Sequence, residues 1–152
     1  VTQGLIFSRV LGTRDFIYDY GPYIYIVTLF VTLAVMHANW HIPGMGIIAL
    51  GALLNAIVIT ANGGYMPADA GAMAALGKVD PTAYSNSAVL PDPALAPLTD
   101  IFALPAWLPY ANVFSLGDVI LGTGIALTII LAMRADRAPT PASPSSAPQA
   151  TA

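Results

Sequence analysis

The chain has 152 residues, of which 57% are hydrophobic and only 9% are charged, and its formal net charge is −3. About a quarter of the residues of a soluble globular domain are charged, so this composition is typical of a membrane protein. The five basic residues form no cluster, which excludes a nucleic-acid-binding surface, and the lack of cysteine excludes disulfides and thiolate metal sites.

Residues 1–20 combine apolar side chains with Arg9, Arg14, Asp15 and Asp19. The apolar residues would share one broad face of a helix: Leu5, Ile6, Phe7, Val10 and Leu11. We therefore expect an amphipathic segment that lies at the membrane interface. We do not expect this segment to be a signal peptide, because the apolar run is too short and no small-residue cleavage site follows it.

No Asp, Glu, Lys or Arg occurs from Tyr20 to Ala68, and this uncharged stretch is interrupted once, between Trp40 and Gly44. Each side of the interruption has about 18–20 mostly apolar residues, which at about 1.5 Å per residue is enough to cross a hydrocarbon core of about 30 Å. The sequence therefore predicts an antiparallel transmembrane hairpin over residues 21–64.

Two local signals set the ends of this hairpin. Pro22 suits the first position of a helix, so the first span is predicted to begin there. The second span is predicted to end at Ala61, because the sequence Asn62-Gly63-Gly64 is typical of a helix stop.

Residues 65–115 are rich in proline and have no sustained helical period, so they are predicted to form a long irregular extramembrane loop. One short helix is expected within the loop, from Asp69 to Leu76. The part from Ile101 to Tyr110 is apolar and aromatic, and its prolines disfavour a long helix. We expect this part to enter the interface or to cover the ends of the spans.

Residues 116–134 are predicted to form a third transmembrane helix. Ser115 and Asp118 have the spacing of a capping box at its start, with aspartate in place of the usual glutamate. Residues 135–152 are mostly proline, alanine, serine and threonine, and this tail is expected to be disordered. The predicted fold class is therefore an all-α membrane protein with three transmembrane helices, formed by the hairpin and one further span.

The basic residues favour one orientation in the membrane. Arg134 and Arg137 lie directly beside the third span, whereas the long loop contains only Lys78. The positive-inside rule then predicts a multi-pass protein of the inner (plasma) membrane with a cytoplasmic C-terminus and an external loop.

The two histidines, His37 and His41, are one helical turn apart at the end of the first span. Such a pair can bind a metal, and a single histidine in a span can be an axial ligand of haem or of a (bacterio)chlorophyll magnesium. The alternative is a pair of interfacial histidines beside Trp40 that bond to headgroups or to the turn. No third metal ligand lies nearby in the sequence.

Polar and small residues in the other spans suggest helix packing. Asn55 lies in the middle of the second span, where an amide normally forms a hydrogen bond across a helix interface, and Gly51 lies one turn before it. Asp118 fits a helix cap, and the alternative is a role in proton or ion movement. Asn62, Gly63 and Gly64 are interpreted as structural.

Several short motifs occur in a fixed order along the chain. They are His41-Ile42-Pro43-Gly44, Ala49-Leu50-Gly51, Leu53-Leu54-Asn55, Ala61-Asn62-Gly63-Gly64-Tyr65-Met66-Pro67, Asp100-Ile101-Phe102 and Val113-Phe114-Ser115-Leu116-Gly117-Asp118-Val119. From Thr28 to Met133 the chain resembles an uncharacterised family of small multi-pass bacterial membrane proteins, classified as a domain of unknown function. The resemblance supports the predicted fold and topology and implies no activity.

Three short spans with glycine-lined faces bury little surface among themselves, and no pocket of converging polar groups can be recognised in the sequence. We therefore expect a non-catalytic accessory subunit of a larger bacterial membrane protein complex, with other membrane subunits and lipids as partners. Two alternatives stay open. One is a pigment- or haem-binding subunit of a photosynthetic or respiratory complex that uses His37 or His41. The other is a small transporter or membrane enzyme that uses Asp118 and Asn55.

Overall fold

The computed structural model describes residues 14–76 and 87–135. Most of the predicted N-terminal interfacial segment and of the predicted disordered tail lies outside these residues. The described part is mostly helical, and its longer helices are α2 (Arg14–Ala38), α3 (Met45–Ala61) and α5 (Leu116–Ala135).

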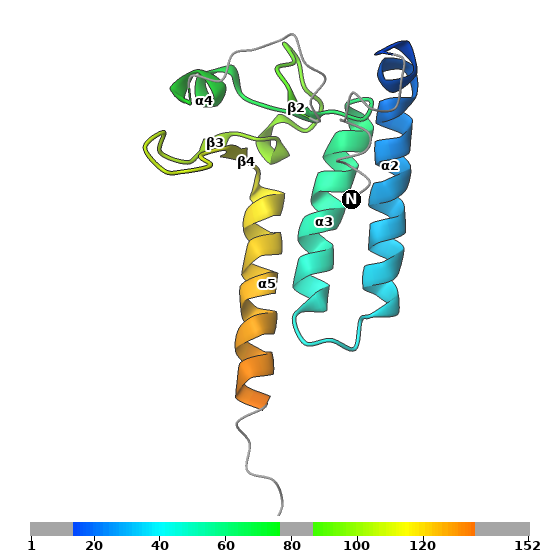
Figure 1. Ribbon diagram of the computed structural model, residues 1–152, viewed down its shortest axis with the longest axis vertical. Coiled ribbons are helices and arrows are strands. Elements are labelled where there is room, and N and C mark those ends of the chain that lie inside the picture. Colours follow the sequence, from blue (N-terminus) through cyan, green and yellow to red (C-terminus); the bar gives the residue numbers. More distant parts are fainter. Residues whose placement is uncertain (1–13, 77–86, 136–152) are drawn as a thin grey trace, which may run out of the picture.

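The three helices lie side by side with α3 in the middle, and α3 runs antiparallel to both of its neighbours (Figure 1). Two stretches, Tyr20–Ala38 in α2 and Leu116–Arg134 in α5, are long and apolar enough to cross a membrane, and α3 is a shorter apolar helix. A tight turn joins α2 to α3, and it ends at Gly44 with φ of 91°, a backbone conformation that favours glycine. The predicted hairpin and third helix are therefore present.

The start of α2 differs from the prediction. Helix α2 already includes Arg14, so Pro22 lies inside the helix and not at its first position. A proline inside a helix removes one backbone hydrogen bond and crowds the preceding turn, which makes the position unusual. The ring of Pro22 is buried against Gly64, where any added Cβ would collide with it. This close contact joins the end of α3 to α2.

The described residues between α3 and α5, which we call the cap, contain short strands as well as helical turns. These elements are β1 (Met66–Pro67), α4 (Ala70–Ala75), β2 (Ser87–Ala88), η2 (Ala96–Leu98), β3 (Phe102–Ala103) and β4 (Val113–Phe114). The helix expected between Asp69 and Leu76 is thus present as α4. The all-α prediction is wrong for the cap, because paired strands supply hydrogen-bond partners for a backbone that proline keeps from forming helices.

Two small ladders hold the cap together. Strands β1 and β2 pair in parallel, and β3 and β4 pair antiparallel with Phe102 opposite Phe114. The rings of Phe102 and Phe114 stack with centroids 5.4 Å apart. An isolated parallel bridge between Ala68 and Asp100 links the two ladders. The cap therefore brings residues near 67, 88, 100 and 114 to the same end of the helices (Figure 1).

Glycines allow α3 and α5 to approach each other closely. A Cβ added at Gly51 would lie 2.5 Å from the carbonyl oxygen of Gly117, and one added at Gly124 would lie 2.7 Å from the backbone nitrogen of Ile48. Contacts of this kind are typical of helix pairs in membranes, where small residues let backbones meet. Gly51 thus lies at the close contact between α3 and α5.

Candidate functional site

A polar network joins the middle of α3 to the start of α5. Asp118 Oδ2 accepts a hydrogen bond of 2.9 Å from the backbone N–H of Ser115, and Ser115 Oγ accepts one of 3.1 Å from the N–H of Asp118. These reciprocal bonds are the capping box that the sequence indicated. Asn55 Nδ2 donates a hydrogen bond to Asp118 Oδ1 at 2.7 Å, and Ser115 Oγ donates one to Asn55 Oδ1 at 2.9 Å.

The network has no room for a larger residue beside it. Gly117 lies directly against the Asn55 side chain, and a Cβ at this position would collide with Asn55 Oδ1. Ser115 is fully buried. Asn55 and Asp118 thus form the cross-helix contact expected of polar groups in apolar helices, and each oxygen of the Asp118 carboxylate has a donor.

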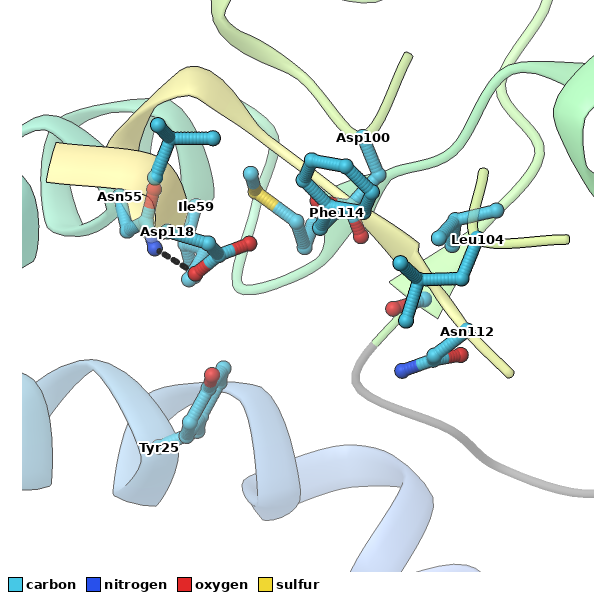
Figure 2. A pocket seen from close by; sticks show the side chains of 12 residues that line it. Tyr25, Asn55, Ile59, Asp100, Leu104, Asn112, Phe114 and Asp118 are labelled. Atoms are coloured by element: carbon cyan, nitrogen blue, oxygen red, sulfur yellow. Dashed lines mark hydrogen bonds between the residues drawn. The ribbon is translucent and has the colours of Figure 1, made fainter. Parts of the chain in front are cut away.

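A cavity of about 580 Å³ lies between this network and the cap. Its polar lining includes Asn55, Asp118, Asp100 and Asn112, and Tyr25 of α2 closes another side. Figure 2 shows these side chains arranged around one space, with Tyr25 across from Asn55 and Asp118. Apolar residues complete the wall: Ile59, Met66, Leu104, Val113, Phe114 and Val119. The volume is in the range of about 300–1,000 Å³ that is usual for small-molecule sites.

Asp100 is the unusual member of this lining. The residue is only 6% exposed, and Oδ1 is buried without a hydrogen-bond partner among the described residues. Burial, together with the nearby charge of Asp118, raises the pKa of Asp100 from 3.8 to about 6. Backbone pairing fixes the position of Asp100, because its N–H donates to Pro67 O and its carbonyl oxygen accepts from Asp69 N.

The histidines lie at the opposite end of the helices. His37 is in the last turn of α2, and His41 is in the turn that follows (Figure 1). Both side chains are exposed, and the rings of His37 and Trp40 are 6.3 Å apart. Within the described residues, no group of three or more His, Cys, Asp or Glu could hold a metal ion. Ligation of a pigment or haem by His37 or His41 stays a prediction.

The sequence Asn62-Gly63-Gly64 ends α3 and ties it to the cap. Gly64 N donates to Ile59 O at 2.8 Å, and Gly63 has φ of 69°, which together form a Schellman motif. Asn62 Nδ2 donates to the carbonyl oxygen of Ala94 at 3.0 Å, and its Oδ1 accepts from Ala94 N at 2.9 Å. These residues are therefore part of the connection between the helices and the cap.

Comparison with known proteins gives one result for the family. The model of a family of unknown function (DUF5317) matches residues 1–130. The chain belongs to this family. No curated protein and no solved structure matches it. Membership of an uncharacterised family is thus confirmed, and the match extends further toward the N-terminus than the motifs indicated.

Sequence reasoning singled out Asn55 and Asp118 but did not assign a site role to Tyr25, Asp100 or Asn112. Asp100 had one usable signal, since it is the acidic residue directly before the apolar run that begins at Ile101. Tyr25 had none, because it is one of several tyrosines near the start of α2. These residues meet only when the cap folds over the helices.

Proposed function

We propose that this member of the DUF5317 family is a multi-pass membrane protein that acts as a non-catalytic accessory subunit of a larger membrane protein complex. The membrane part of the proposal is supported by the outer helices. Only 17% of the apolar stretch of α2 and 11% of that of α5 is buried, whereas a core helix of a soluble protein is mostly buried. Large apolar side chains such as Val31, Phe30 and Ile129 are exposed along these helices.

The observation that carries the accessory role is the outer face of α5. Among the described residues, and apart from its own stretch of helix, Gly122 has no atom within 4 Å of the position that a Cβ would occupy, so it takes no part in the contact with α3. Ala126 is one turn further along and is also exposed. Two small residues at this spacing allow close approach of another helix in a membrane.

Transport has less support from the geometry. Asn55 and Asp118 are bonded to each other and to Ser115 at the capped end. Beyond them, the backbones of α3 and α5 are in close contact at Gly124 and Ile48, with no polar side chain of the network reaching further. A static pair that is satisfied internally fits a packing role better than a path for ions or protons.

The test is co-purification of the full chain from native membranes in mild detergent, followed by mass spectrometry with quantified stoichiometry. We expect partner membrane subunits in a fixed ratio to the wild-type chain, and at least a fivefold reduction for Gly122→Leu. Leu127→Phe enlarges an exposed side chain on a different face of α5, and this matched control should retain its partners. A chain that arrives alone, or a Gly122→Leu variant that keeps its partners in full, contradicts the proposal.

A further inference from the structure

We propose that the cavity under the cap binds an amphipathic organic monocation, a primary alkyl- or arylammonium ion, with the Asp100 carboxylate as its counter-ion. This site goes beyond the proposed accessory role and does not depend on it. The cavity lies at the capped end of the helices, and Asn55 and Asp118 of the polar network form part of its wall (Figure 2).

Asp100 has unmet hydrogen-bonding capacity. The residue is only 6% exposed, and Oδ1 lacks a partner among the described residues. Buried carboxylates in folded proteins are nearly always paired, because an unpaired one loses its hydration without compensation. An ammonium group in the cavity would supply the missing donor and the missing positive charge.

The charge of the described lining is negative. Among the described residues that line the cavity, Asp118 is the other carboxylate and none is Lys, Arg or His. Both Asp118 oxygens already accept hydrogen bonds from Asn55 and Ser115, so Asp118 adds negative potential, whereas Oδ1 of Asp100 has no donor among the described residues. The electrostatic influence of Asp118 on Asp100 is part of the reason why the pKa of Asp100 is raised.

The other residues that line the cavity favour an organic ion over a metal ion. A divalent metal ion would need more acidic or histidine ligands than the described residues bring together. The rest of the wall is mixed. Polar side chains such as Asn112 lie beside the aromatic rings of Tyr25 and Phe114 and the aliphatic side chains of Ile59 and Leu104. Such a wall suits the hydrocarbon part of an amine, and aromatic faces attract cations.

The test is isothermal titration of the full chain, held in a non-ionic detergent at pH 7.5, with benzylammonium chloride. We expect saturable binding with one site per chain, and at least tenfold weaker binding by Asp100→Asn. Asp92→Asn is the matched control, because Asp92 is an exposed aspartate of the cap outside the cavity. This control should bind as the wild type does. Benzyl alcohol, which has a similar shape without the charge, should give no saturable binding.

A second variant and a competition arm complete the test. Leu104→Trp places a larger side chain at the cavity wall without changing its charge and should also abolish binding. Lysophosphatidylethanolamine is then titrated against bound benzylammonium, with lysophosphatidylglycerol as its control. Competition by the former alone identifies a lipid headgroup as the source of the ammonium, and no competition identifies a soluble amine. Absence of saturable binding, equal binding of benzyl alcohol, or full binding by Asp100→Asn would overturn the proposal.

Discussion

Asn55 and Asp118 form an amide–carboxylate pair, in which the amide donates a hydrogen bond that a second carboxylate could not supply. Asn55 Nδ2 donates to Asp118 Oδ1 at 2.7 Å, and the other oxygen of Asp118 caps α5 through Ser115 N. Both oxygens of the carboxylate therefore have donors supplied by the protein.

Substitution Asn55→Asp would place a second carboxylate where the amide now donates. We expect the free energy of unfolding to fall by about 2 kcal/mol or more at pH 7.5, because two carboxylates this close repel each other and one donor is lost. Thermal unfolding in detergent measures the loss. The swapped double variant Asn55→Asp with Asp118→Asn restores one amide and one carboxylate, and it should recover much of the stability. A double variant no more stable than the single one would show that the pair is not the cause.

Asp100 gives the protein a predictable dependence on pH. Its pKa is about 6 in the folded protein and near 3.8 when unfolded, so the folded state holds the proton more tightly. This contribution to stability is fully present below pH 3.8 and is lost as the pH rises through 6. The loss is on the order of 1–3 kcal/mol.

We therefore expect Asp100→Asn to be more stable than the wild type at pH 7.5 and to lose less stability between pH 4 and pH 7.5. Asparagine has nearly the same shape, and it removes a buried unpaired charge. Denaturant unfolding of both proteins across this pH range measures the difference. The variant Asp92→Asn should follow the wild-type curve. Parallel curves for the wild type and Asp100→Asn would contradict the raised pKa.

The contact between α3 and α5 depends on glycine at the closest points. A Cβ at Gly124 would lie 2.7 Å from the nitrogen of Ile48, whereas one at Gly122 would meet no described residue outside its own helix within 4 Å. The two positions thus separate internal packing from the outer surface of the same helix.

We expect Gly124→Leu to lower the free energy of unfolding by about 1–3 kcal/mol or more, because the helices would have to move apart. Gly122→Leu should change it by no more than about 0.5 kcal/mol, as is usual for surface positions. Thermal unfolding of both variants in the same detergent provides the comparison. Equal losses at the two positions would mean that α5 packs against α3 through a different face.

The helices could be predicted from the sequence better than the cap and the cavity. The long uncharged run and the Asn62-Gly63-Gly64 stop indicated the hairpin, since length and hydropathy are local properties. The start of α2 was missed because Pro22 suits a helix start and is also tolerated inside this helix, against Gly64. The two-residue strands and the cavity were missed because both depend on pairing between distant segments, such as Ala68 with Asp100.

The whole molecule has two different ends. The cap lies over one end, and the turn between α2 and α3 lies at the other end together with the end of α5 (Figure 1). Trp107, which is 80% exposed, is in the cap, and His41 is exposed in the turn. In the proposed membrane topology these two residues are on opposite sides of the bilayer.

The chain has no cysteine, so single-cysteine variants can report this topology without background. We expect Trp107→Cys to react with a membrane-impermeant maleimide in intact cells, and His41→Cys to react only after permeabilisation. The opposite pattern would invert the predicted orientation, and labelling of both from one side would rule out the arrangement of three spans.

The short middle helix has a consequence for the surrounding lipid. At about 1.5 Å per residue, the 17 residues of α3 extend about 25 Å, which is less than a hydrocarbon core of about 30 Å. In the proposed membrane topology, adjacent lipid would have to thin, or the cap would have to be drawn toward the acyl chains, at a cost of fractions of a kcal/mol per Å of hydrophobic mismatch. The length of the lipid acyl chains would then affect the position of the cap. In a thin bilayer the cap would stay in water. In a thick bilayer its exposed Trp107 and Tyr110 would be pressed against the headgroups.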